Sequence, residues 1–179
     1  MKINSGEFKY RNIEIPYGIR PTTEKVREAV FSMIREWIPG GVMLDLFAGS
    51  GVMGLEALSR GADKCYFCDS NRSNFKVLLG NIENCKAGDR AVTFNCDFRS
   101  AITRIGEKLD VVFMDPPYDN VEYYGEAFDL LQERGLLDEG SVVVAEHLFE
   151  NELSDSYGRL QRIKSKKYGT IGVDVYIYE

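Results

Sequence analysis

The sequence predicts an α/β protein with a doubly wound, mostly parallel sheet. From about residue 42 onward, apolar segments of strand length alternate with segments of helical character. This alternation is typical of a parallel sheet with helices on both faces, because crossovers between parallel strands are right-handed. With 179 residues, the chain is long enough for one domain with a substantial core.

The predicted strands of the parallel part are Val42–Phe47, Lys64–Cys68, Ala91–Cys96, Leu109–Met114 and Ser141–Ala145. The helices between them are expected near residues 52–60, 71–84, 98–106 and 121–134. Two later strand-like segments, Leu160–Lys167 and Ile171–Tyr178, leave room only for a turn between them. These two segments should therefore form an antiparallel pair on one edge of the sheet.

An N-terminal extension precedes the sheet. Residues 6–15 indicate a small β-rich piece, and an apolar stripe from Val26 to Trp37 predicts a helix that ends at Pro39. We therefore divide the chain into an N-terminal piece, residues 1–38, and a main domain, residues 39–179.

The composition is that of an ordinary globular protein, with 44% hydrophobic and 28% charged residues. No apolar run reaches the ~18 residues of a membrane span, and the N-terminus lacks the apolar stretch of a signal peptide. We therefore expect a cytoplasmic protein without membrane contact.

Cys65 and Cys68 are three residues apart on a strand and point to opposite faces, so we expect reduced thiols and no metal ion.

The net charge of −6 argues against a protein that holds nucleic acid by its overall field. Two segments are locally basic: Arg159–Lys167, which contains no acid, and the first 35 residues. Each is either a solvated face or a local patch for phosphate contacts.

A glycine-rich turn follows the first predicted strand. Gly49, Gly51 and Gly54 match G-x-G-x-x-G between a strand and a helix, the setting in which a backbone approaches a nucleotide-like cofactor. Asp45, inside the strand, would direct a carboxylate toward this turn, which suits a cationic amine better than a pyrophosphate. Asp69 ends the second strand, where a carboxylate can accept ribose hydroxyls. Asp45 thus favours S-adenosylmethionine over NAD, whereas Asp69 serves either cofactor.

Two further positions have open interpretations. Asp97 and Phe98 follow the third strand, where they either contact an adenine ring or act as a helix N-cap and a core residue. Glu146 ends the fifth strand and either lines the site or caps a helix.

Asp115-Pro116-Pro117-Tyr118 follows the fourth strand, at the sheet edge where open α/β sheets bind ligands. Two prolines make the loop stiff and remove two donors, so the loop presents the Asp115 carboxylate and the Pro116 carbonyl as acceptors. Two acceptors that hold the hydrogens of an exocyclic amine can free its delocalised lone pair for attack. Tyr118 can stack on the base. Together with the glycine turn, this loop predicts methyl transfer to a nucleobase nitrogen.

The motifs resemble those of a known family. Asp45-Leu-Phe47-Ala-Gly49-Ser-Gly51 and the Asp115–Tyr118 loop are typical of class I methyltransferases that act on amino groups. Arg20-Pro-Thr22-Thr23, followed by Val26-Arg27-Glu-Ala29, is narrower and resembles the RsmD-like family, which methylates the exocyclic N2 of a guanine in small-subunit (16S) ribosomal RNA. The family usually opens with Gly-x-x-Arg-Gly-Arg, and the less basic Gly6-Glu-Phe-Lys-Tyr-Arg11 stands here.

This resemblance implies a Rossmann-like sheet of seven strands with a reversed last strand, S-adenosylmethionine as cofactor, and ribosomal RNA as partner, free or within the assembling small subunit. We expect the protein to act as a monomer. The catalytic group would comprise Asp115, Pro116, Pro117 and Tyr118. The cofactor group would comprise Asp45, Phe47, Gly49, Gly51, Gly54, Asp69, Asp97 and Phe98. The RNA group would comprise Arg11, Arg20, Thr22, Thr23 and Arg27, at a substrate entrance formed by the N-terminal piece.

Three other functions are alternatives. A DNA or other RNA amino-methyltransferase shares the Asp115–Tyr118 motif, although DNA enzymes usually carry an added recognition domain for which 179 residues leave little room. A dinucleotide-dependent oxidoreductase shares the glycine turn but has no use for the proline loop. A non-catalytic RNA-binding module would not need the glycine turn, Asp69 and the proline loop together.

Overall fold

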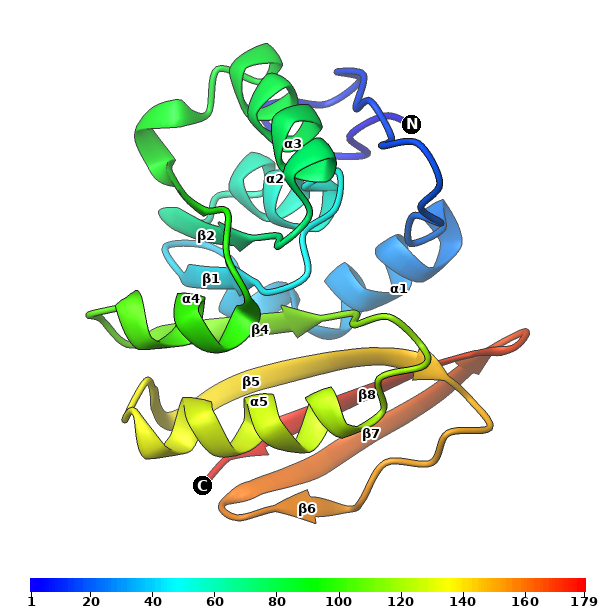
Figure 1. The fold of residues 1–179 in the computed structure, drawn as a ribbon, viewed down its shortest axis with the longest axis vertical. Helices are drawn as coiled ribbons and strands as arrows, with labels where there is room; N and C mark the ends of the chain where they lie inside the picture. The colour runs from blue at the N-terminus through cyan, green and yellow to red at the C-terminus, as the bar shows by residue number, and fades with distance from the viewer.

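The computed structural model describes residues 1–179 and contains one eight-stranded sheet (Figure 1). In chain order the strands are β1 Val42–Asp45, β2 Lys64–Cys68, β3 Ala91–Phe94, β4 Leu109–Met114, β5 Leu137–Leu148, β6 Ser156–Tyr157, β7 Leu160–Tyr168 and β8 Ile171–Tyr178. Their order across the sheet is β3-β2-β1-β4-β5-β8-β7-β6. Strands β1 to β5 are parallel, whereas β8 is antiparallel to both β5 and β7.

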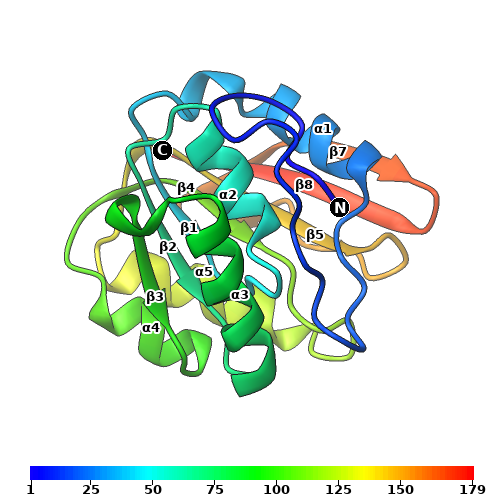
Figure 2. The same cartoon turned by 90° about the horizontal axis from the view of Figure 1, so that it is seen from above.

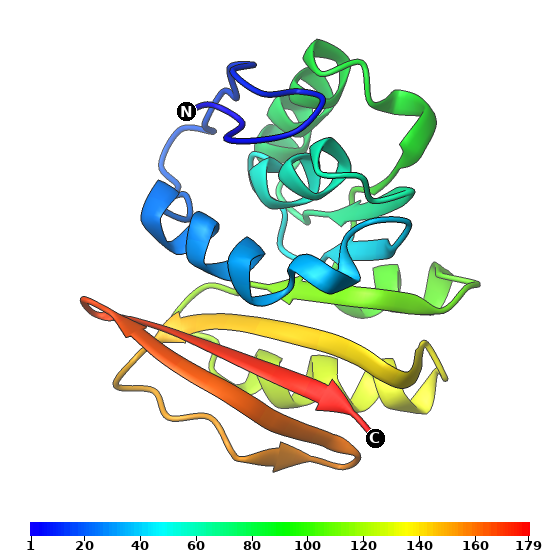
Figure 3. The same ribbon diagram turned by 180° about the vertical axis from the view of Figure 1, so that it is seen from behind.

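Helices cover both faces of the sheet, as Figures 1 and 3 show from opposite sides. The α-helices are α1 Glu24–Met33, α2 Val52–Ser59, α3 Arg72–Asn84, α4 Phe98–Arg104 and α5 Glu122–Glu133, with short 3-10 turns at Arg35–Trp37 and Gly88–Arg90. Apolar residues of α1, α2 and α3 pack into one core layer, and those of α4 and α5 pack into the other. Figure 2 shows α1 and α5 on opposite sides of the strands.

The chain reverses its direction across the sheet between β1 and β4. After β1 the chain moves outward through β2 to β3, and it then returns to place β4 on the other side of β1. The carboxyl ends of β1 and β4 therefore lie side by side, with Asp45 in register with Phe113. Such a reversal leaves a crevice at the carboxyl ends of the two strands.

The predicted fold class is confirmed, with three differences of detail. The sheet has eight strands because a two-residue strand, β6, pairs with β7. Strand β5 begins at Leu137 and ends at Leu148, beyond the predicted bounds on both sides. The antiparallel pair lies at the predicted edge, but β8 separates β7 from β5.

The β-rich prediction for residues 6–15 was wrong. The segment forms consecutive turns, with Lys9 N donating to Gly6 O and Arg11 N donating to Phe8 O, and its only strand-like feature is a bridge between Lys2 and Asn12. Positive φ angles at Gly6 and Tyr10 prevent an extended course. Apolar side chains of the segment pack into the core layer of α2 and α3. The division at residue 38 stays a prediction.

The predicted N-terminal helix is present as α1. Thr23 caps it by accepting a hydrogen bond from Val26 N, and Ile34 ends it. The apolar stripe continues into the 3-10 turn, where Trp37 Nε1 donates to Gly140 O at 2.8 Å. No helix in the structure combines the length and the apolar character that crossing a bilayer requires.

Candidate active site

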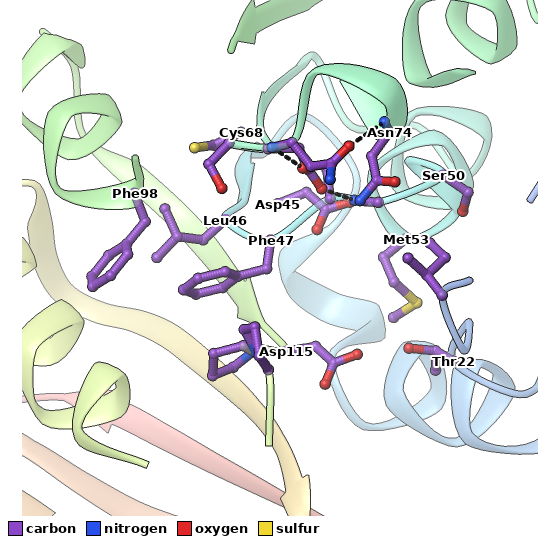
Figure 4. A pocket seen from close by; sticks show the side chains of 18 of the residues that line it. Thr22, Asp45, Leu46, Phe47, Ser50, Met53, Cys68, Asn74, Phe98 and Asp115 are labelled. Carbon is purple, nitrogen blue, oxygen red and sulfur yellow. Dashed lines mark hydrogen bonds between the residues drawn. The ribbon is translucent and has the colours of Figure 1, made fainter. Parts of the chain in front are cut away.

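A cavity of about 550 Å³ opens at the carboxyl ends of β1, β2 and β4 (Figure 4). Residues 18–22 of the N-terminal segment line one side, and the glycine turn and the end of β2 line another. The loops after β3 and β4 complete the wall. The structure thus joins segments that are far apart in the sequence at the place where the strand order reverses.

The glycine turn is held in place by a hydrogen bond from its backbone to a side chain and by close packing. Gly49 has a φ of +56° and its N–H donates to Asp69 Oδ2 at 2.9 Å. Gly51 has a φ of +82° and forms the N-cap of α2. A Cβ at Gly54 would lie 2.3 Å from the ring of Phe67, so this glycine lets α2 pack on β2. Of the three glycines, Gly49 lines the cavity, whereas Gly51 and Gly54 shape the turn behind it.

Asp45 directs a buried carboxylate into the cavity. The residue is 1% exposed, and its Oδ2 accepts a hydrogen bond from Gly54 N at 3.1 Å. Burial raises the pKa of Asp45 to about 7, against the Gly54 hydrogen bond and with a smaller contribution from the charge of Asp69. A buried carboxylate in this state favours a cationic ligand, because a nearby positive charge offsets the lost hydration.

Asp69 and Asp97 lie at the ends of neighbouring strands, and both line the cavity. Asp69 accepts backbone N–H groups on both oxygens, from Gly49 and from Asn71. Asp97 caps α4 by accepting a hydrogen bond from Arg99 N at 2.9 Å. The two interpretations of Asp97 are therefore compatible, because the capping residue also faces the cavity.

Aromatic rings form the wall next to Asp97. The Phe98 ring centroid lies 5.2 Å from that of Phe47 and 4.9 Å from that of Tyr123. Phe47 and Tyr123 are nearly parallel, with 10° between their planes. All three side chains line the cavity, and such a wall suits a planar ring.

The Asp115–Tyr118 loop faces the glycine turn across the cavity. The partly buried Asp115 carboxyl receives no hydrogen bond from the protein. Burial, together with the charges of Glu146 and Asp45, raises the pKa of Asp115 well above its usual range. Burial raises the pKa of Tyr118, and the negative charges of Asp115 and Glu146 raise it further because they disfavour the ionised phenol. All four residues of the loop line the cavity.

The N-terminal segment supplies the opposite rim. Arg20 is exposed and lines the cavity, and Thr22 is buried at its inner end. The Thr22 hydroxyl donates to Glu146 Oε2 at 2.7 Å. Glu146 is buried on β5 and does not cap a helix, so its carboxyl supports the wall of the cavity from behind.

Three predicted RNA residues lie outside the cavity. Arg11 is partly buried, and its Nη1 donates to Asn84 O at 2.6 Å. Thr23 is exposed at the N-terminus of α1. Arg27 does not fit the predicted RNA contact, because it is 1% exposed. Its Nε lies 3.4 Å from Glu56 Oε1, and its Nη2 donates to Lys2 O and Asn4 Oδ1.

Sequence reasoning missed several residues of the cavity. Tyr123 lies in the first turn of α5, soon after the proline loop, and a search for aromatic residues next to the motif would have found it. Others carry no local signal, because only the folded chain brings them to the cavity; among them are Ile19, Met53, Asn74 and Asn120.

The chain is similar to known sequences over nearly its whole length. The family model described as Conserved hypothetical protein 95 matches residues 1–177. A protein of Bacillus subtilis named "Putative rRNA methyltransferase YlbH" is 35% identical over 98% of both chains. The Escherichia coli protein named "Ribosomal RNA small subunit methyltransferase D" is 32% identical over 98% of this chain and 89% of its own length.

Solved structures share the fold of the chain. A structure described as "Putative methyltransferase yhhF from Escherichia coli" superposes with a TM-score of 0.90 at 32% identity, covering 100% of this chain and 98% of the other. An RNA methyltransferase from Salinibacter ruber, solved with S-adenosyl-L-homocysteine, shares the fold with a TM-score of 0.69 at 16% identity, over 89% of this chain and 95% of its own. The chain therefore belongs to the Conserved hypothetical protein 95 family of RsmD-like methyltransferases.

Proposed function

We propose that the protein transfers a methyl group from S-adenosylmethionine to the exocyclic N2 amine of a guanine in small-subunit ribosomal RNA. The observation that carries this proposal is the Asp115 carboxyl, which has no protein partner and faces the same cavity as the glycine turn. The related proteins named as ribosomal RNA methyltransferases support the choice of substrate.

The residues on the β1–β3 side of the cavity fit S-adenosylmethionine, which supplies an electrophilic methyl group on a cationic sulfur. Asp45 would hold the cationic amine, and Asp69 would accept the ribose hydroxyls. Phe47 and Phe98 would cover the adenine ring, with Asp97 accepting its amine. No basic side chain lines this part of the cavity, so a pyrophosphate finds no counter-charge there.

The residues on the β4 side would act on the substrate amine. The Asp115 carboxylate and the Pro116 carbonyl would each accept one hydrogen of the amine and hold its nitrogen toward the cofactor side. Tyr118 would stack on the base. The prolines keep these acceptors in place before substrate arrives, so little reorganisation is needed during the reaction.

The base must leave its stack to reach the acceptors, because Asp115 and Pro116 line the cavity and are at least partly buried. Arg20 is the basic residue of the cavity lining and is exposed, so it can meet a phosphate next to the extruded base. A protein of net charge −6 depends on such local contacts.

Methyl transfer to total ribosomal RNA that lacks the modification tests the proposal. RNA from cells without the gene is incubated with the protein and methyl-labelled cofactor, digested, and analysed for the labelled nucleoside and its position. We expect N2-methylguanosine at one site of the small-subunit RNA. The Asp115→Ala variant, which retains the cofactor side of the cavity, provides the control for contaminating activity. Label in N6-methyladenosine, in large-subunit RNA or only in DNA would refute the proposal.

A further inference from the structure

The hydrogen bond between Thr22 and Glu146 fixes the direction in which the Thr22 hydroxyl points its proton. A hydroxyl has one proton and two lone pairs. The Thr22 proton is donated to Glu146 Oε2 at 2.7 Å, inside the protein, so the lone pairs of this hydroxyl remain for the cavity that Thr22 lines.

Glu146 is well placed to remain the acceptor of this bond. It is 3% exposed, and Thr22 is the side chain that donates to its carboxyl. Burial raises the pKa of Glu146, but the Thr22 hydroxyl and the charge of His147 favour the ionised form. Asp115 has no such partners, and the charge of Glu146 is one of the causes that raise the pKa of Asp115. Tyr124 also donates to the backbone oxygen of Glu146 at 2.6 Å, which fixes this end of β5.

The substrate side of the cavity therefore presents acceptors on both sides of the base. Figure 4 shows the Thr22 and Asp115 side chains on facing walls of the same part of the cavity. The Watson–Crick edge of guanine carries adjacent donors, N1–H and the N2 amine. Adenine also carries an exocyclic amine, but its N1 is an acceptor. The lone pair of this N1 would face a lone pair of the Thr22 hydroxyl, and no hydrogen bond would form.

We propose that the Thr22 hydroxyl, oriented by Glu146, accepts the N1–H of the target base and so selects guanine over adenine. This inference rests on the proposed function, because it assigns a residue to the recognition of the same base. Asp115 and Pro116 hold the amine, which both purines possess, and Thr22 reads the neighbouring ring position, where the two purines differ. Glu146 is a positioning residue that does not touch the base.

Isosteric substitutions separate this role from packing. Thr22→Val keeps the shape and removes the acceptor, and Thr22→Ser keeps the hydroxyl. In Glu146→Gln, the amide can donate to Thr22, which frees the Thr22 proton to face the cavity and to meet the N1 of adenine. The preference is the ratio of kcat/KM for two transcripts that carry guanine or adenine at the position mapped with the unaltered protein.

We expect the unaltered protein and Thr22→Ser to favour guanine strongly. Thr22→Val and Glu146→Gln should each lower this preference by about tenfold or more, since an unpaired buried polar group weakens binding by that order. Glu146→Gln should also raise methylation of the adenine transcript in absolute terms. The ratio of the affinities for the two transcripts, measured with S-adenosylhomocysteine present so that no turnover occurs, should shift in the same direction as the ratio of kcat/KM.

Affinity for S-adenosylhomocysteine alone shows whether each variant keeps a folded cavity. Suppose that Thr22→Val or Glu146→Gln binds S-adenosylhomocysteine normally. If it then retains the original preference for guanine, or binds both transcripts more weakly by the same factor, the inference is overturned and the proposed function stands. If the unaltered protein methylates no guanine N2, the proposed function itself fails. The two failures are therefore distinguishable.

Discussion

At the scale of single residues, we expect Asp45 to make cofactor binding depend on pH. Its pKa of about 7 means that the carboxyl of the free protein is mostly protonated below about pH 7. A bound ammonium group favours the ionised form, so binding below this pH requires the release of a proton, which weakens affinity by up to about tenfold per pH unit. Affinity should therefore rise with pH and level off above about pH 7.

Calorimetric titration with S-adenosylhomocysteine between about pH 6 and pH 8.5 measures this dependence. The Asp45→Asn variant should bind more weakly at high pH and show a flat profile. A profile that is equally steep in both proteins would assign the titration to another group.

Asp115 should affect turnover and not cofactor affinity. Its carboxyl faces the substrate side of the cavity and has no structural hydrogen bond to lose. Asp115→Ala should lower kcat by about two to three orders of magnitude, the usual effect of removing one preorganised polar partner. Single-turnover methyl transfer with saturating cofactor measures the loss, and calorimetry checks that S-adenosylhomocysteine binding persists. Normal turnover in Asp115→Ala would exclude the mechanism.

At the scale of secondary structure elements, Gly54 sets the distance between α2 and β2. A Cβ at this position would lie 2.3 Å from Phe67 Cε1 and 2.7 Å from Cys65 Sγ, and both atoms belong to the packed core. Gly54→Ala should therefore destabilise the protein by about 1–3 kcal/mol. Urea denaturation followed by circular dichroism measures the change.

Gly80 provides the matched control, because it lies on the exposed side of α3 and a Cβ there meets no atom within 4 Å. Gly80→Ala should leave stability unchanged or raise it by up to about 1 kcal/mol, since alanine is the better helix former. An equal loss in both variants would mean that the packing of α2 is not the cause.

The two basic segments should contribute differently to RNA binding. Arg20 lies on the rim of the cavity, whereas Lys164 is exposed on β7 and does not line it. Arg20→Ala should reduce the slope of log affinity against log salt by about one unit, the contribution of one phosphate contact, and Lys164→Ala should leave the slope unchanged. Filter binding across a salt series measures both slopes. The opposite result would mean that the RNA approaches over β7.

The sequence predicted those parts of the site that local patterns determine. Asp115 and Gly49 each follow an apolar strand, and parallel strands bring their carboxyl ends to one edge of the sheet. The bond between Thr22 and Glu146 joins residues 124 positions apart, and no local pattern indicates it. Arg27 was misjudged because its burial depends on contacts with Lys2, Asn4 and Glu56, which no local pattern indicates. The two-residue β6 is shorter than any pattern can resolve.

At the scale of the whole molecule, the pair formed by Arg27 and Glu56 ties the N-terminal segment to the sheet domain. Glu56 also accepts the N–H groups of Asn4 and Ser5, and Arg60 remains paired with it at 3.0 Å. Arg27→Ala should cost about 3 kcal/mol, the lower end of the range for a broken buried pair, because Arg60 still compensates Glu56.

The free energy of unfolding in urea tests this contribution. Lys25, an exposed basic residue on the same helix, provides the control, and Lys25→Ala should change stability by no more than about 0.5 kcal/mol. Weaker RNA binding by Arg27→Ala would then reflect a loosened N-terminal segment, which also carries Arg20 and Thr22. Equal stabilities of the two variants would show that the pair is dispensable.

The position of β8 has a consequence for the order in which the molecule matures during synthesis. Strand β8 follows β7 along the chain but lies between β5 and β7, and its Val173 is in register with Glu146 of β5. Until β8 emerges from the ribosome, β5 has an open edge whose unpaired backbone groups are a template for pairing with another chain. Strands β1 to β4 need no such late partner. The nascent protein can therefore assemble the glycine-turn half of the cavity first, and it completes the wall that Glu146 supports only when β8 inserts.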